Sequence, residues 1–208
     1  MRWTRCSLLA ASLIAAAACG SGAEPGAGAP ESAGSAPAAP APAEPQQTLG
    51  GGRATQIHPG DAGSPHVKVD WAVDGADISI TYGRPYLKGR VVGESVEPME
   101  GRVWRLGADE ATILTTERDL MIGETHVPAG QYTLWVLDRG DTWDLIVNSQ
   151  TGQWGTSYDQ AQDFARIPMT VTETNTPADQ LILSIDGGEF KVEWGRMVAT
   201  VPLQVHQS

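Results

Sequence analysis

Cysteine is scarce in this sequence: the chain has two, Cys6 and Cys19. Removal of an N-terminal export signal containing Cys6 would leave a single cysteine, which excludes a disulfide within the chain. If Cys19 is then modified, no thiol remains for catalysis. The disulfide-stapled and thiol-dependent classes of protein are therefore excluded.

Basic residues are also few. The chain has 14 Lys and Arg against 25 Asp and Glu, a net charge of −11 at pH 7, and the loss of Arg2 and Arg5 with an export signal would make it −13. A surface of this sign repels nucleic-acid phosphates and anionic lipids. We therefore exclude nucleic acid as a partner, and we exclude electrostatic docking on a membrane.

The apolar run over residues 8–18 is too short to cross a bilayer, which needs about 20 apolar residues. It follows a short basic segment, the order typical of an export signal. The run ends in Ala16-Ala17-Ala18-Cys19-Gly20, which resembles the lipobox of bacterial lipoproteins, although Leu is more common than Ala at the first of these positions. We predict a lipoprotein signal peptide over residues 1–18 and lipidation of Cys19.

Acyl chains on Cys19 would anchor the protein to a membrane, because each buried methylene contributes about 0.8 kcal/mol. Gly20, in place of Asp, favours the outer membrane by resemblance to lipoprotein sorting in Gram-negative bacteria. We expect an extracytoplasmic location in the cell envelope. The alternative is an ordinary signal peptide, whose cleavage would leave Cys19 as a free thiol.

Residues 19–52 are rich in Ala, Pro, Gly, Ser and Glu and contain no aromatic residue. Such a segment buries too little apolar surface to offset the entropy lost on ordering. We predict a disordered tether that carries one domain, residues 53–208, away from the membrane.

The domain alternates apolar and polar residues with the period of β-strands. Gly140-Asp141 and Gly187-Gly188 are typical of hairpin turns, and only Tyr158–Ala165 has a helical pattern. The predicted fold class is all-β, a single antiparallel β-sandwich or jelly-roll domain. The predicted strands are residues 67–71, 78–82, 111–116, 119–122, 132–136, 143–147, 169–173, 180–185, 190–194 and 198–205.

The motifs of common catalytic and cofactor sites are absent: there is no G-x-S-x-G, no G-x-G-x-x-G, no P-loop and no H-E-x-x-H. Aspartates at 138, 141 and 144 surround a turn but do not match a calcium-binding loop. The histidines are scattered without the spacing of metal ligands, at His58, His66, His126 and His206. We predict no metal and no cofactor.

Three arginines crowd into a short stretch that acidic residues follow at the start of a strand. The stretch contains Arg84, Arg90 and Arg105, and after it come Asp109, Glu110 and Thr112. Arginine presents a planar fork of donors suited to carboxylate or phosphate. The three arginines, Glu110 and Thr112 are thus candidate contacts for a small polar or anionic ligand. Alternatively, the same residues would form a lattice of ion pairs that ties loops together. We favour this structural role. Glu110 or Asp109 beside an arginine are candidates for a general acid or base.

The same segments carry a family resemblance. The chain is similar to the bacterial DUF2911 family, a domain of unknown function, over residues 64–205. The resemblance rests on Ser64-Pro65, Tyr82 with Arg84-Pro85, Lys88-Gly89-Arg90, Val103-Trp104-Arg105, Gly107 to Thr112, Pro128-Ala129-Gly130 with Tyr132, and Trp143. Members often carry Asn at the position of Asp109 and Thr at that of Leu106. The resemblance implies an exported β domain and supplies no activity.

Six tryptophans in the domain suggest a carbohydrate-binding alternative, in which sugars stack on exposed indoles. Trp143 and Trp194 share a face with aliphatic neighbours, which predicts core positions. Trp135 and Trp154 are the two indoles predicted to be exposed.

The function predicted from the sequence is a non-enzymatic envelope lipoprotein that binds a small polar or anionic ligand or an envelope component. The alternatives are a hydrolase that acts on an envelope component, a carbohydrate-binding module, and a protein that pairs with a partner through a sheet edge.

Overall fold

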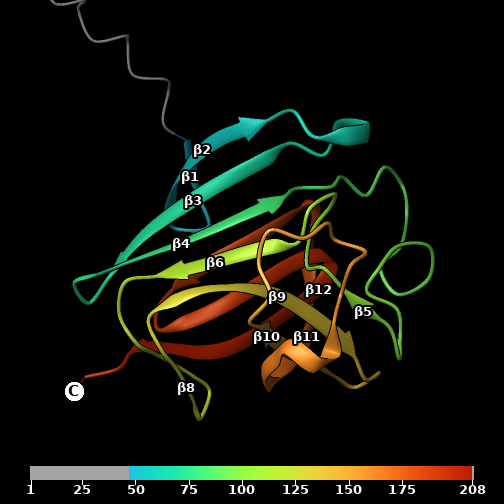
Figure 1. Cartoon of the computed structure of the whole chain (residues 1–208). Coiled ribbons are helices and arrows are strands. Elements are labelled where there is room, and N and C mark those ends of the chain that lie inside the picture. Colours follow the sequence, from blue (N-terminus) through green and yellow to red (C-terminus); the bar gives the residue numbers. More distant parts are fainter. Residues whose placement is uncertain (1–46, 208) are drawn as a thin grey trace, which may run out of the picture. The chain divides into compact units, whose positions relative to one another are not determined.

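The computed structural model describes residues 47–207, and nearly all of their regular structure is β-sheet (Figure 1). The predicted signal peptide, Cys19 and most of the predicted tether lie outside the described residues. Within 47–207 there is no α-helix, and thus no helix with the length and apolar character needed to cross a membrane. The all-β prediction is confirmed.

Twelve strands and two short 3-10 turns make up this part of the chain. The strands are β1 (Gln47–Leu49), β2 (Gly52–His58), β3 (His66–Val73), β4 (Ala76–Gly83), β5 (Val103–Trp104), β6 (Thr112–Thr116), β7 (Leu120–Ile122), β8 (Thr125–Val127), β9 (Gly130–Asp138), β10 (Thr142–Asn148), β11 (Asp163–Asp186) and β12 (Glu189–Val205), and the turns are η1 (Asp61–Gly63) and η2 (Gln160–Gln162).

All strand pairs in this sheet are antiparallel. The strand order is β1-β2-β3-β4-β6-β9-β10-β11-β12-β7-β8, with β5 paired to β9. Most neighbours are therefore consecutive in sequence, joined by tight turns such as those at Gly140 (φ 90°) and Gly187 (φ 60°), as predicted. This order gives no support to the jelly-roll part of the prediction.

The long strands β11 and β12 fold the sheet over on itself. The first part of β11 pairs with β10. From Thr170 to Asp186, β11 also pairs with β12, and the register of this second pairing shifts between Glu173 and Ile182. Beyond the shift, β11 lies against the end of β4, where the Leu183 N–H donates to the Tyr82 hydroxyl at 3.1 Å. Figure 1 shows β11 and β12 behind β4, β6 and β9. The result is a sandwich-like fold with its core between the two layers.

The core confirms two of the tryptophan predictions and corrects a third. Trp143 and Trp194 are buried, and Trp154 is 46% exposed, as expected. Trp135, predicted to be exposed, is 1% exposed. The prediction was wrong because the 149–162 loop covers the outer face of β9, so that the ring of Tyr158 lies 5.1 Å from that of Trp135. Both faces of this strand are therefore buried.

Element boundaries differ from the predictions in three places. Residues 47–52, assigned to the tether by composition, form β1 and the start of β2, held by a hydrogen bond from the Trp71 indole to the Gly50 carbonyl. The predicted strands 169–173 and 180–185 are one strand, β11, and the two that follow are β12. The helix predicted over Tyr158–Ala165 is wrong: only η2 is helical, because Asp163 already pairs with Asn148 of β10.

Replacing Tyr82 with Phe tests the contact between the layers. The change leaves the buried Leu183 N–H without an acceptor, which costs about 1–3 kcal/mol, or a fall in melting temperature of roughly 2–10 °C for a domain of this size. Tyr86→Phe is the matched control, because Tyr86 is 39% exposed. Equal melting temperatures of the two variants in the full chain would contradict this role of Tyr82.

Candidate functional site

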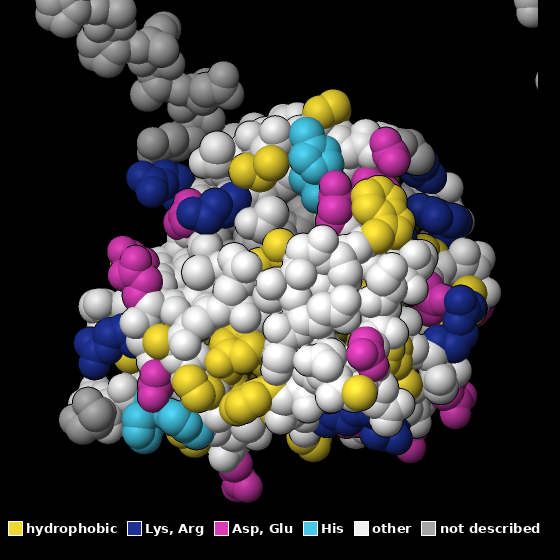
Figure 2. Space-filling model, viewed as in Figure 1, with side chains coloured by type: hydrophobic (Ala, Val, Ile, Leu, Met, Phe, Trp, Pro, Cys, Tyr) yellow, Lys and Arg dark blue, Asp and Glu magenta, His cyan; other side chains and the backbone are white. Residues whose placement is uncertain are grey.

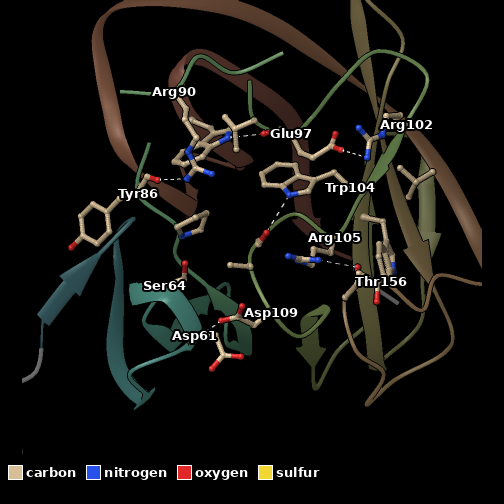
Figure 3. A pocket seen from close by; sticks show the side chains of 18 of the residues that line it. Asp61, Ser64, Tyr86, Arg90, Glu97, Arg102, Trp104, Arg105, Asp109 and Thr156 are labelled. Atoms are coloured by element: carbon tan, nitrogen blue, oxygen red, sulfur yellow. Dashed lines mark hydrogen bonds and ion pairs between the residues drawn. The ribbon is translucent and has the colours of Figure 1, made fainter. Parts of the chain in front are cut away.

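A cavity of about 610 Å³ lies beside the 84–109 segment. Figure 3 shows Arg90, Arg102 and Arg105 around it. Its walls also carry aromatic rings, from Trp104, Trp135, Tyr158 and Trp194 among others. The charged residues that line it are Lys88, Arg90, Arg102 and Arg105, with Asp61, Glu97 and Asp109. Cationic side chains therefore outnumber acidic ones here, in a chain that is acidic as a whole.

Two of these arginines are held by neutral groups. Arg90 donates from Nε to the Leu87 carbonyl (2.9 Å) and from Nη2 to the Tyr86 carbonyl (2.6 Å). Arg105 donates from Nη1 to the Gly155 carbonyl at 3.4 Å, and its buried Nε makes no hydrogen bond within the described residues. A carbonyl orients a guanidinium without cancelling its charge. No carboxylate among their hydrogen-bond partners therefore offsets these two guanidinium groups at the cavity.

Arg102 differs, because its Nη2 lies 2.8 Å from Glu97 Oε1 in an ion pair. Arg84 does not line the cavity: its Nε donates to the Leu181 carbonyl (3.0 Å) and so ties β4 to β11. Within the described residues, Arg84, Arg90 and Arg105 tie segments together through backbone carbonyls and make no ion pair. The sequence pattern placed carboxylates near these arginines in the chain, whereas folding placed backbone carbonyls beside Arg84, Arg90 and Arg105.

The turn before β6 separates the remaining predicted site residues. Leu106 (φ 51°) and Asp109 (φ 60°) adopt left-handed backbone conformations. Thr112 is fully buried, and its hydroxyl donates to the Leu106 carbonyl at 2.9 Å, which stabilises the turn. Asp109 lines the cavity and accepts the Asp61 N–H at 2.9 Å. Glu110 does not line the cavity and lies next to two histidines, one of which is also near Asp109.

The histidines are scattered in the sequence and paired in space. His58 and His66 are cross-strand partners of β2 and β3, and their rings stack at 4.2 Å. Nε2 of His66 lies 3.0 Å from Glu110 Oε2 and 3.4 Å from Asp109 Oδ2. His126 and His206 form a second pair elsewhere, and Figure 2 shows two separate histidine groups. Strand β2 was not predicted from the sequence, and so His58 was not paired with His66 across the β2–β3 hairpin.

Glycine lets these segments approach one another. An added Cβ at Gly155 would lie 1.9 Å from Arg105 Cδ, and one at Gly83 would lie 2.4 Å from the Ala108 carbonyl oxygen. Neither position has room for a larger side chain. The Gly155 backbone thus sets where Arg105 runs, and Gly83 sets how closely the Asp109 turn packs on β4.

One wall of the cavity contains a perturbed phenol. The Tyr158 hydroxyl donates to Asp163 Oδ2 (2.7 Å) and accepts from Arg166 Nη2 (2.9 Å). Burial, and then the Asp163 carboxylate, raise the pKa of Tyr158 to about 12. The folded protein binds this proton more tightly than the unfolded chain does. Its contribution to stability is therefore complete below about pH 10 and is lost as the pH rises to about 12.

Substitution of Asp163 with Asn should lower the pKa of Tyr158 towards its ordinary value. The change removes the carboxylate that accepts the hydrogen bond of the phenol, while Arg166, which donates to the phenol oxygen, remains. Ultraviolet titration of the full chain measures phenolate formation, and subtraction of the Tyr158→Phe titration isolates this residue. An unchanged Tyr158 titration in Asp163→Asn would mean that the carboxylate does not hold the proton.

Comparison with known proteins identifies a family and no activity. The family model described as a protein of unknown function (DUF2911) matches residues 64–203. No curated protein and no solved structure matches the chain. The matched range contains the cavity arginines, Asp109, Glu110 and His66. Because the match spans most of the folded domain, the chain belongs to the DUF2911 family of proteins of unknown function.

Proposed function

We propose that this protein is a lipid-anchored envelope protein whose β domain binds a small organic anion in the arginine cavity. The observation that carries the proposal is the state of Arg90 and Arg105, whose guanidinium groups line the cavity and are bonded to carbonyl oxygens instead of carboxylates. An anion entering the cavity would meet two fixed positive charges that no acidic side chain neutralises directly.

The size and walls of the cavity support a small ligand. About 610 Å³ falls within the usual range of small-molecule sites, roughly 300–1,000 Å³. Aromatic side chains such as Trp104 and Tyr158 offer flat apolar surface beside the cationic groups. This combination favours an anion that also carries a ring or a short carbon skeleton over a bare inorganic ion.

The place in the cell is proposed from the sequence signal alone. A signal peptide over residues 1–18, lipidation of Cys19 and Gly20 at the next position support anchoring at the outer membrane of the cell envelope. A lipid anchor would hold the protein at the membrane and keep the cavity in contact with solutes outside the cytoplasm.

A hydrolase is the second candidate, and a specific contact favours it. Asp109 lines the cavity, and its Oδ2 lies 3.4 Å from Nε2 of the buried His66, a pairing that suits proton transfer to a bound ligand. The two candidates differ in one observable, because a hydrolase consumes a bound ester or phosphate and a binding protein returns it unchanged.

Ligand binding is tested by thermal shift of the full chain with citrate, succinate, phenyl phosphate and inorganic phosphate. A ligand at 100 times its dissociation constant stabilises by about 2.7 kcal/mol, a rise of roughly 5–10 °C. Arg105→Ala should weaken the affinity by about 10-fold to 100-fold, because a hydrogen bond to a charged group is lost.

Arg196→Ala is the control, because Arg196 is exposed and pairs with Glu173 outside the cavity. Its affinity should equal that of the parent chain. The proposal fails if no anion shifts the melting temperature, or if Arg105→Ala binds as tightly as Arg196→Ala.

Replacing Cys19 with Ser tests the anchor. The variant should move from the membrane fraction of the producing bacterium to the soluble fraction, because it lacks the residue that would be acylated. Cys6→Ser is the matched control and should stay with the membrane. Mass spectrometry of the purified variants should find acyl chains on Cys6→Ser and none on Cys19→Ser, and an acylated Cys19→Ser variant would contradict lipidation at this position.

A further inference from the structure

A second polar cluster lies next to the arginine cavity, where β2 ends, β3 begins and the Asp109 turn packs on both. His58, His66 and Glu110 each offer one ligand atom, and these atoms all lie within 4.8 Å of one another. Two imidazoles and a carboxylate are a donor set typical of zinc and related divalent metals.

The buried atoms of this cluster lack hydrogen bonds. The His66 side chain is 4% exposed, and its Nε2 makes no hydrogen bond within the described residues. Glu110 Oε2 is likewise buried without one, although it lies only 3.0 Å from that nitrogen. Leaving such atoms without partners is costly in a protein interior. A cation between them would satisfy both at once.

The spacing fits a metal coordination sphere. Zinc binds nitrogen and carboxylate oxygen at about 2.0–2.2 Å in tetrahedral sites, which places neighbouring ligand atoms about 3.3–3.5 Å apart. The corresponding separations are 3.0 Å for His66 Nε2 to Glu110 Oε2, 3.4 Å for His66 Nε2 to Asp109 Oδ2 and 3.6 Å for His58 Nε2 to Glu110 Oε1. Coordination therefore needs the side chains to move together, because the three ligand atoms lie within 4.8 Å of one another and the two histidines face different oxygens of Glu110.

We infer that His58, His66 and Glu110 form a binding site for a divalent transition metal, with zinc as the probe ion, and that Asp109 lies beside it as a further oxygen donor. Asp109 also lines the arginine cavity, so the metal would lie at the border of the cavity. This site lies outside the arginine contacts, and the test below does not depend on anion binding.

One contact has to change when the metal binds. The Gly60 N–H donates to His58 Nδ1 at 3.1 Å, which leaves the proton of a neutral His58 ring on Nε2. Ligation through Nε2 moves that proton away and gives up the Gly60 bond. The loss is small compared with the free energy of metal ligation, because it is a single hydrogen bond between neutral groups at a half-buried position.

The experiment uses the full chain with Cys6→Ser and Cys19→Ser, so that no thiol competes for zinc. After dialysis against a chelator, calorimetric titration with Zn²⁺ and elemental analysis should give about one zinc per chain. His58→Ala and Glu110→Gln should each lower the zinc affinity more than about 100-fold, beyond the effect expected for groups outside a coordination sphere. Circular dichroism should match the parent chain, because both residues are partly exposed.

His126→Ala is the matched control. It removes a histidine from the other pair, which also lies beside a carboxylate, Asp119, and it should bind zinc like the parent chain. Co²⁺ supplies a second measurement, because its visible absorption bands on binding should vanish in His58→Ala and persist in His126→Ala.

Three results would overturn the inference. The first is that the parent chain takes up no zinc. The second is that His58→Ala and Glu110→Gln bind zinc as the parent does. The third is that His126→Ala alone abolishes binding. None of these bears on anion binding by Arg105.

Discussion

The pairing of β11 with β10 ends at Thr170. The backbone N–H and C=O groups of the rest of β11 therefore need hydrogen-bond partners on other elements. These partners lie on β12 and at the end of β4, where the Tyr82 hydroxyl accepts the Leu183 N–H and Arg84 donates to the Leu181 carbonyl. This contact brings the two layers together, encloses the core, and fixes where the 84–109 segment leaves β4. The cavity and the histidine cluster both depend on that exit point.

Close packing at glycines then sets the geometry of the site. The turn that carries Asp109 rests on Gly83, and Arg105 passes over Gly155, with no space for a Cβ at either position. Asp109 consequently lies where it contacts both the arginine cavity and His66. The two proposed sites share this carboxylate, so a ligand at either would change the electrostatics of the other.

Charge distribution gives the cavity its character. The chain carries a net charge of −11, and Figure 2 shows acidic and basic side chains mixed over the visible face instead of forming one large patch of either sign. Against this background, Arg90 and Arg105 are bonded to carbonyl oxygens and are not paired with a carboxylate. The net negative charge of the protein repels anions at long range. Binding of an anion would therefore depend on the hydrogen-bond donors fixed inside the cavity.

The sequence by itself determined the all-β class, the hairpin turns at Gly140 and Gly187, and the buried positions of Trp143 and Trp194, because alternation and turn residues act over a few neighbouring residues. It also showed the family through a specific string around Trp104. Only the tertiary structure decided that Trp135 is covered by another loop and that Arg105 donates to the Gly155 carbonyl. It alone set His58 and His66 beside Glu110. These outcomes depend on segments far apart in the chain, whose contacts no local pattern encodes.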